Sequence, residues 1–353
     1  MTDIKEGLLQ DVSKFRTQIM GFAAMWIFIF HVRNEILVFR GVPVLCDLEI
    51  FFANIGFTGV DIFLFLSGWG LINAIRKHNL LDFYKRRYRR LVFPFVLACL
   101  VPALYYKWEL LRFIRAVTGW TFLTKNIFEQ AWFIPAIAIL YLFFPLYHKF
   151  FEKASNKYIF TAVMIAVWFV FALAGTILSG RTDYYVFINR IPVFLVGILF
   201  GWMDNSKKKI PEVAAWIVIT VMLISGFQIL YYTAFQKINF ILPQGSGLPA
   251  LLVGIAMCFV FARIFSLLSK VTFIQKAFGF LGKRSLEFYM MQEILIYILQ
   301  EELLYAGVPF NKHLFVLIVF LFCLGGAYLT HLLFTTITDK LDGKSAFAVN
   351  EKA

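Results

Sequence analysis

The chain consists of long apolar runs separated by short polar stretches. A helix that crosses the hydrocarbon core of a bilayer needs about 20 predominantly apolar residues, and runs of this kind recur along almost the whole sequence. The pattern predicts an all-α integral membrane protein of about ten transmembrane helices. We place them at residues 17–37, 51–75, 91–106, 131–147, 158–179, 184–202, 213–231, 248–268, 286–306 and 314–337. The third and fourth runs are short, so we expect those helices to extend into the adjoining loops.

Polar sequence lies at both ends of this series of runs. Residues 1–16 predict a cytoplasmic N-terminal segment, residues 17–337 a single ten-helix membrane domain, and residues 338–353 a cytoplasmic tail. No linker rich in Pro, Gly or Ser divides the domain. The N-terminal segment lacks the pattern of a cleavable signal peptide, so we expect the first apolar run to remain as a helix. We expect no fused extracytoplasmic domain after the last helix.

Composition excludes a soluble globular protein. Hydrophobic residues make up 61% of the chain, and the mean hydropathy is +0.77. Soluble domains are about half apolar, whereas helices that face lipid carry apolar side chains on their outer surface as well. The four cysteines form no CxxC motif or Cys/His cluster, so we expect no bound metal.

The distribution of Lys and Arg gives the predicted helices a direction. Alternate loops hold 23 of these residues on one side and 9 on the other, out of 34 in the chain. Cytoplasmic loops carry the excess of positive charge, so both termini are predicted to be cytoplasmic in a multi-pass protein of the plasma membrane. Topology therefore accounts for the net charge of +13, and we expect no nucleic-acid partner, since no basic stripe lies on a soluble element.

Three ionisable residues fall within the outer halves of predicted spans, where charge is costly and usually functional. His31 ends the first run, Asp61 lies in GVDIFLFLSGWG, and Arg190 lies in NRIPVFLVGILFG. Their depths match, so Asp61 is expected to orient His31 as a general base, to pair with Arg190, or both. The alternatives are an interfacial histidine and a carboxylate that only bonds a neighbouring helix. Glu293 is also deep in its span.

An arginine tract precedes the third span, at Arg86, Arg87, Arg89 and Arg90 in FYKRRYRRLVFPF. Such tracts usually anchor a helix or attract anionic headgroups, and they are equally suited to phosphates, because guanidinium presents a planar fork of donors. Glu287 lies near the inner end of the ninth span, where it is either interfacial or functional. A base near one face and a phosphate-binding rim at the other suit a long donor with a charged head and a reactive tip.

The order of these motifs resembles the acyltransferase-3 family of integral membrane acyltransferases. GVDIFLFLSGWGLI and FYKRRYRRLVFP are similar to its signature, and AWFIPAIAILYLFFPL, NRIPVFLVGILFG and LGKRSLEFYM are similar to its later segments. The resemblance implies a core of ten membrane helices and transfer of an acyl group, most often acetyl from acetyl-CoA as co-substrate. The implied acceptors are hydroxyls of cell-surface glycans or glycolipids. His31 would be catalytic, and an RxxR pair (Arg86 with Arg89, or Arg87 with Arg90) would contact the donor.

The sequence departs from the family pattern at two positions. Met20 stands where the family often has an arginine eleven residues before the histidine, and Arg16, one helical turn earlier, could take that role in donor binding. Gln292 stands where many members have a further histidine, so that position supplies no base.

The resulting hypothesis is an O-acyltransferase in which His31 and Asp61 are catalytic. Arg190 would stabilise an oxyanion or hold the acceptor, and the arginine tract with Arg16 would bind acetyl-CoA. The alternative is a polytopic transporter or flippase that moves a glycan or lipid without covalent chemistry. The sequence leaves the acceptor, the acyl-chain length and the oligomeric state open.

Overall fold

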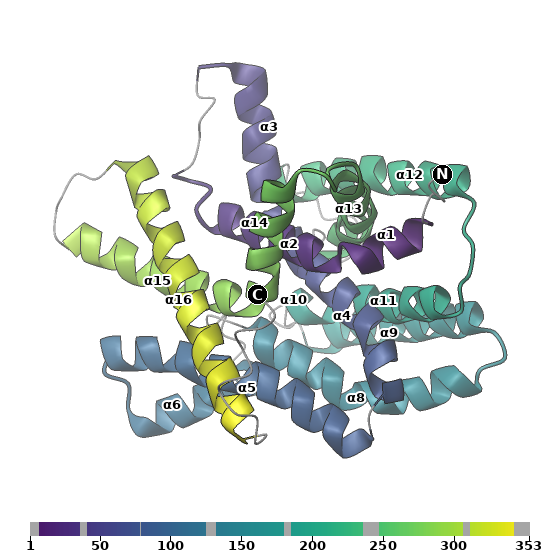
Figure 1. Cartoon of the computed structure of the whole chain (residues 1–353), viewed down its shortest axis with the longest axis horizontal. Coiled ribbons are helices and arrows are strands. Elements are labelled where there is room, and N and C mark those ends of the chain that lie inside the picture. Colours follow the sequence, from purple (N-terminus) through teal and green to yellow (C-terminus); the bar gives the residue numbers. More distant parts are fainter. Residues whose placement is uncertain are drawn as a thin grey trace.

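The computed structural model describes residues 7–35, 41–77, 79–124, 132–179, 185–235, 247–305 and 311–341. Within these ranges every regular element is helical (Figure 1), as the apolar runs predict. The elements are α1 (Leu8–Lys14), α2 (Arg16–His31), α3 (Pro43–Asn54), η1 (Gly56–Thr58), α4 (Gly59–Lys77), α5 (Leu80–Tyr105), α6 (Leu110–Val117), α7 (Trp120–Thr124), α8 (Phe133–Lys153), α9 (Lys157–Ser179), α10 (Tyr185–Ile188), α11 (Ile191–Asn205), α12 (Glu212–Leu230), η2 (Tyr231–Phe235), α13 (Gly247–Leu267), α14 (Thr272–Lys283), α15 (Ser285–Tyr305) and α16 (Lys312–Leu341).

Eight stretches of helix in the described ranges are long and apolar enough to cross a membrane. They are Pro43–Lys77, Leu80–Tyr105, Phe133–Lys153, Lys157–Gly175, Val186–Asn205, Glu212–Thr233, Pro249–Leu267 and Lys312–Lys340. The predicted spans 17–37 and 286–306 are not among them. Helix α2 has only 16 residues, and α15 contains four glutamates. A count of ten therefore depends on these two helices, and the side that each terminus faces remains a prediction from loop charge.

The two short runs, 91–106 and 131–147, are parts of longer helices, as we expected. Helix α5 begins eleven residues before the first run, and α8 ends six residues after the second. The N-terminal segment differs from the expectation of a plain polar stretch, because residues 8–14 form α1. Val12 of α1 is fully buried and Leu9 is 5% exposed. Buried Asp11 forms an ion pair with Arg263 of α13 at 3.5 Å. An apolar face with i, i+3 spacing and a paired acid thus tie this segment to the bundle.

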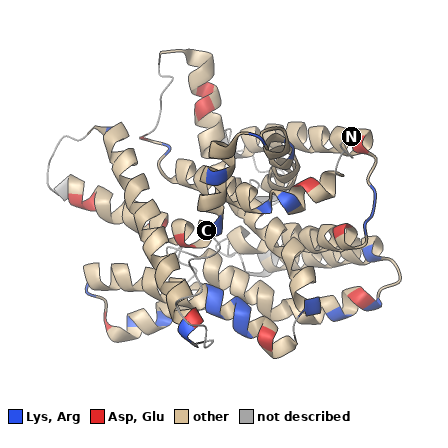
Figure 2. Ribbon diagram, viewed as in Figure 1, with Lys and Arg blue, Asp and Glu red and all other residues tan. Residues whose placement is uncertain are grey.

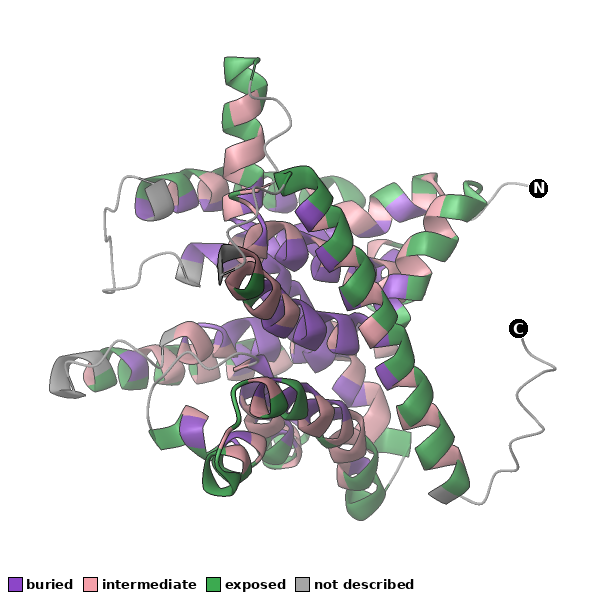
Figure 3. Ribbon diagram, turned by 90° about the vertical axis from the view of Figure 1, so that its left-hand side faces the viewer, coloured by how far each residue is buried: buried purple, intermediate pink, exposed green. Residues whose placement is uncertain are grey.

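Helix α2 lies in the interior of the bundle, in contact with α4, α13, α14 and α15. Figure 3 shows buried residues gathered in the middle of the molecule and exposed ones on the outer helices. The approach of α14 to α2 is close because both helices present glycine. A Cβ atom on Gly21 would lie 2.2 Å from the carbonyl oxygen of Phe278, and one on Gly282 would lie 1.8 Å from that of Thr17.

Glycines also bring α4 and α11 together. A Cβ atom on Gly68 would lie 2.3 Å from the Phe194 oxygen, and one on Gly197 would lie 2.2 Å from the Phe65 oxygen. Gly201 meets the Trp69 oxygen at 2.4 Å in the same way. The GxxxG spacing of Gly197 and Gly201 therefore serves the close packing of α11 against α4. This contact holds the N-terminal ends of α4 and α11 side by side; Asp61 lies in the first turn of α4, and Arg190 is the N-cap residue of α11.

Two helices that precede the site residues are interrupted. Helix α3 is separated from α4 by η1, and α10 is separated from α11 by a turn at Asn189 and Arg190. Charged residues occupy few positions along the helices (Figure 2), so a charged side chain within the bundle is a candidate functional residue.

We predict that Gly197→Ala destabilises the protein by about 1–3 kcal/mol, because the added methyl group forces α4 and α11 apart. The readout is the thermal unfolding of purified protein in detergent. The matched control is Gly325→Ala in α16, where an added Cβ meets nothing within 4 Å. Helix propensity alone should make that control neutral or up to about 1 kcal/mol more stable. Equal melting temperatures for the two variants would contradict the packing argument.

Candidate active site

His31 is the last residue of α2, and a carboxylate of α15 lies against it. Its Nε2 atom is 3.8 Å from Oε1 of Glu293, with side-chain exposures of 21% and 10%. The hydroxyl of Tyr289, one turn earlier on α15, donates to the same Glu293 oxygen at 2.9 Å. Residues four apart on a helix share a face, so Tyr289 fixes the carboxylate that faces His31. The Nδ1 atom of His31 is buried and has no hydrogen-bond partner among the described residues.

Asp61 and Arg190 form a second buried pair beside the first. Nε of Arg190 is 3.4 Å from Oδ1 of Asp61, and the side chains are 5% and 0% exposed. Nη1 of Arg190 donates to the Val186 carbonyl at 2.6 Å, in the helix that precedes the turn. The guanidinium carbon also lies 5.5 Å from the centre of the Trp132 ring. The predicted contact between Asp61 and Arg190 is therefore present.

Tyr289 bonds Glu293 of the first pair, and it is near enough to Arg190 of the second for the two to interact electrostatically. Its ring centroid is 5.5 Å from that of Phe133, the neighbour of Trp132. The end of α2 meets η1 through Phe30 and Phe57, whose ring centroids are 5.6 Å apart. The fold thus gathers side chains from α2, α4, α15 and the turn before α11 into one polar network, which we call the histidine network (His31, Asp61, Arg190, Tyr289 and Glu293).

The carboxylate nearest His31 is Glu293, and not Asp61, which the sequence analysis expected to orient the histidine. Asp61 is paired with Arg190, and Glu293 faces the imidazole instead. Asp61 also lies against α13, where a Cβ atom on Gly254 would come within 2.6 Å of the Asp61 Cβ. A buried guanidinium needs an opposing charge, and Asp61 supplies it. The depth of Glu293 in its span indicates from sequence that this carboxylate is a candidate partner inside the bundle. The sequence analysis does not identify Tyr289, although its i, i+4 spacing places it on the same helix face as Glu293.

Gln292, next to Glu293, is fully buried, and neither its amide oxygen nor its nitrogen has a hydrogen-bond partner within the described ranges. It adds an uncharged polar group to this part of α15. An amide does not titrate, so Gln292 supplies no base here.

A second group of polar side chains lies at the opposite end of α2. Nη2 of Arg16 donates to the Leu66 carbonyl of α4 at 3.0 Å. Gly70 leaves the room for this side chain, since a Cβ atom there would lie 2.5 Å from Arg16 Nη2. Arg87 of α5 is close enough to repel Arg16 electrostatically, and Tyr141 also interacts with Arg16. The guanidinium carbon of Arg87 lies 6.0 Å from the centre of the Tyr141 ring.

The four residues of the arginine tract face different surroundings. Arg86 is exposed, and Arg87, Arg89 and Arg90 are half-buried. Arg90 forms an ion pair with Glu287 of α15. The structure therefore brings Arg16 and Arg87 together, and it places Arg90 in a separate cluster.

Two other features of the described residues lie outside these groups. No cluster of three or more His, Cys, Asp or Glu residues suited to a metal ion occurs among them.

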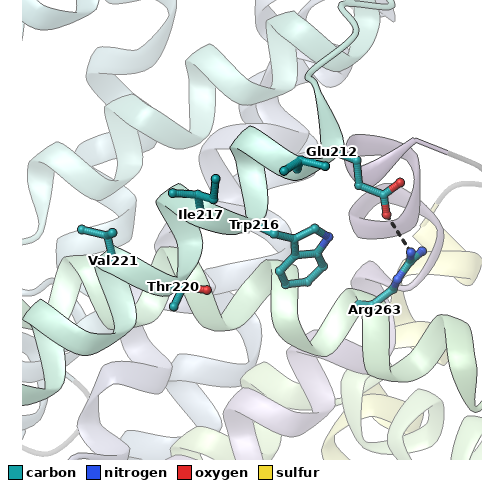
Figure 4. Close-up of a pocket in the computed structure, with 7 residues that line it drawn as sticks. Glu212, Trp216, Ile217, Thr220, Val221 and Arg263 are labelled. Atoms are coloured by element: carbon teal, nitrogen blue, oxygen red, sulfur yellow. Dashed lines mark hydrogen bonds and ion pairs between the residues drawn. The ribbon is translucent and has the colours of Figure 1, made fainter.

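A surface groove of about 660 Å³ runs along α12 and α13 (Figure 4). Its lining includes Trp216 and the ion pair between Glu212 and Arg263, which are 2.7 Å apart. The groove shares no lining residue with the histidine network.

Comparison with known proteins gives a consistent family assignment. The peptidoglycan O-acetyltransferase OatA of Listeria monocytogenes serovar 1/2a is 25% identical over 282 residues, which are 69% of this chain and 45% of that protein. The O-acetyltransferase OatA of Staphylococcus aureus strain NCTC 8325 is 25% identical over 213 residues, 50% of this chain and 35% of its own length. The alignments thus span less than half of these relatives. No solved structure matches the chain.

The sequence profile of the acyltransferase-3 family, described as an acyltransferase domain, matches residues 19–332. This range contains the histidine network and the arginine tract, and it covers most of the chain. The protein therefore belongs to the acyltransferase-3 family of membrane acyltransferases.

Proposed function

We propose that this protein is a membrane O-acyltransferase that moves an acetyl or other acyl group from acyl-CoA to a hydroxyl of a cell-surface glycan or glycolipid. The donor, acetyl-CoA in the simplest case, would bind from the cytoplasm, and the acceptor would enter from the opposite side. The observation that carries the proposal is the approach of His31, a partly buried histidine at the end of α2, to the carboxylate of Glu293 in a chain of this family. The peptidoglycan O-acetyltransferase name of the Listeria relative supports a cell-wall or cell-surface acceptor.

His31 would act as the general base through Nδ1, a buried ring nitrogen with no hydrogen-bond partner in the described structure, while Nε2 faces Glu293. It takes the proton of the acceptor hydroxyl while the hydroxyl oxygen attacks the thioester carbonyl. The carbon–sulfur bond then breaks, and His31 returns the proton to the leaving thiolate. Glu293, 3.8 Å from Nε2, stabilises the imidazolium that forms in between. A transient acyl-histidine would use the same nitrogen.

Arg190 would stabilise the negative charge that develops on the carbonyl oxygen, or would hold a polar group of the acceptor. Such donors act strongly where water is excluded and where they are already oriented. Asp61, the bond to the Val186 carbonyl and the Trp132 ring hold the guanidinium in place. Asp61 thus serves His31 only indirectly, through Arg190.

The chain also offers a binding place for the phosphates of a CoA thioester. Arg16 and Arg87 approach each other near Tyr141 despite their like charge, and the Nε atom of Arg16 is buried with no hydrogen-bond partner in the described ranges. Guanidinium groups in this state favour an anion with several acceptor oxygens. Exposed Arg86 and half-buried Arg89 extend the positive charge along the rim.

A transporter or flippase remains a second candidate because of one observation. The interruptions before α4 and before α11 place two discontinuous helices next to each other, and substrate sites of many transporters lie at such breaks. Release of free thiol from acetyl-CoA by the purified protein separates the two functions. An acyltransferase consumes the thioester, whereas a transporter moves its substrate without doing so.

We predict that His31→Ala abolishes surface O-acylation in a complemented deletion strain, with a loss of about 10²–10⁴-fold in rate. The measurement is mass spectrometry of surface glycans, at equal abundance of protein in the membrane. The matched control is His313→Ala, which removes an exposed histidine at the start of α16 and should leave acylation unchanged. Wild-type levels of acylation in the His31 variant would refute the mechanism.

We further predict that Glu293→Gln lowers the turnover number on the order of 10²-fold, because the amide keeps the shape of the carboxylate but cannot stabilise the imidazolium. The KM for acetyl-CoA should change little, since Glu293 contacts His31 and Tyr289 rather than the arginine tract. Steady-state thiol release by purified protein checks both values. Glu302→Gln, on the same helix and bonded to Tyr105, is the control; an equal effect of the two substitutions would argue against a role for Glu293 at His31.

A further inference from the structure

Glu287 is a fully buried carboxylate in the first turn of α15, and its partners come from two other helices. Nη2 of Arg90 in α5 donates to Oε2 at 2.9 Å, and Nη1 contacts Oε1. Nδ1 of His331 in α16 lies 2.9 Å from Oε1. The three helices pack against one another, with α16 crossing α5 and α15 (Figure 1). One carboxylate therefore joins α15 and its neighbour α16 to α5, which lies about two hundred residues earlier in the chain.

Arg90 is engaged within the protein on several sides. Besides Glu287, Nη2 reaches the Lys283 carbonyl at 3.3 Å, and the guanidinium carbon lies 5.3 Å from the centre of the Phe334 ring. A two-pronged contact between guanidinium and carboxylate fixes the plane of the arginine as well as its position. The charge of Arg90 is balanced by Glu287, and its ring-facing side is covered.

Arg87, one turn earlier on α5, is in the opposite situation. No ion pair of Arg87 or Arg16 with a carboxylate occurs within the described ranges, although each guanidinium raises the positive potential at the other. Arginine binds phosphate most readily where its charge is not already compensated. Arg87 and Arg90 thus have different electrostatic surroundings. The charge of Arg90 is compensated by Glu287, whereas the charge of Arg87 is available to bind an anionic ligand.

We propose that the two arginines have separate roles: Arg90 is a positioning residue held by Glu287 and His331, and the donor phosphates bind Arg87 together with Arg16. This division rests on the proposed function, because it concerns how the acyl-CoA site is built. Glu287 and His331 tie α5 to α15 and α16, and so set where the turn that carries Arg87 lies relative to α2. The resemblance to the family implies donor contact by one of two RxxR pairs, Arg86 with Arg89 or Arg87 with Arg90, and by both members of that pair.

The test uses the full-length protein in detergent and measures two quantities, the dissociation constant of CoA by calorimetry and the melting temperature. Glu287 is fully buried, so Arg90→Gln removes the arginine that balances its charge, whereas replacing both partners by neutral groups removes that buried charge as well. We therefore expect Arg90→Gln to lower the melting temperature, and the double variant Arg90→Gln/Glu287→Gln to recover at least half of that loss. CoA affinity of the double variant should stay within about twofold of the wild-type value.

Arg87→Gln is the comparison within the same tract. We expect it to weaken CoA binding about tenfold, equivalent to 1.4 kcal/mol, with an unchanged melting temperature. Equal weakening of CoA binding by the double variant and by Arg87→Gln would overturn the proposal, as would a double variant no more stable than Arg90→Gln. Where the double variant does not fold, Arg90→Lys keeps a charge opposite Glu287; unchanged CoA affinity supports the proposal, and weakening by about fivefold or more overturns it.

A failure of the proposed function and a failure of the division of roles give different experimental results. If the wild-type protein binds no CoA, the proposed function fails, and the assignment of Arg87 and Arg16 fails with it. The melting temperatures would still report whether Arg90 and Glu287 act as a coupled pair. If the wild type binds CoA and the double variant binds it as poorly as Arg87→Gln, the function stands and the division of roles is wrong.

Discussion

A charge placed inside an apolar helical bundle must meet an opposite charge, and this constraint organises the whole molecule. Asp61 meets Arg190 and Glu287 meets Arg90, while Glu293 faces the imidazole of His31 and Glu287 also bonds the imidazole of His331. Apart from the contact of Glu287 with His331, each joins helices that are far apart in the sequence. Breaking such a pair leaves an uncompensated buried charge, so each pair restricts how its helices can be placed. Helix α15 supplies the acid for two of the three.

Close packing through glycine allows these pairs to form. The contacts at Gly68, Gly197 and Gly201 bring α4 against α11, and those at Gly21 and Gly282 bring α14 against α2. The two helix interruptions then place Asp61 and Arg190 at N-terminal turns, where they face each other rather than lipid. Packing and chemistry are therefore linked at the same helices.

The helices that carry the chemistry are those that least resemble ordinary membrane spans. Helix α2 is short and ends at His31, and α15 contains four glutamates. Neither is long and apolar enough by itself to count as a span among the described residues. Both are shielded by neighbours, because α2 is enclosed by α4, α13, α14 and α15. Shielding by more apolar helices lets a membrane protein keep ionisable groups in its interior.

The sequence by itself determined the membrane character, the helical class, the family resemblance and most of the ionisable residues that the structure gathers. These follow from composition and from the length of apolar runs, which are local properties of the chain. The sequence did not determine which acid faces His31, and it missed Tyr289. Helices that are apolar on nearly every side give no sign of their rotation, so partners on separate helices cannot be assigned from spacing. Only the packed bundle decided that Glu293 faces His31, that Asp61 belongs to Arg190, and that Glu287 holds Arg90.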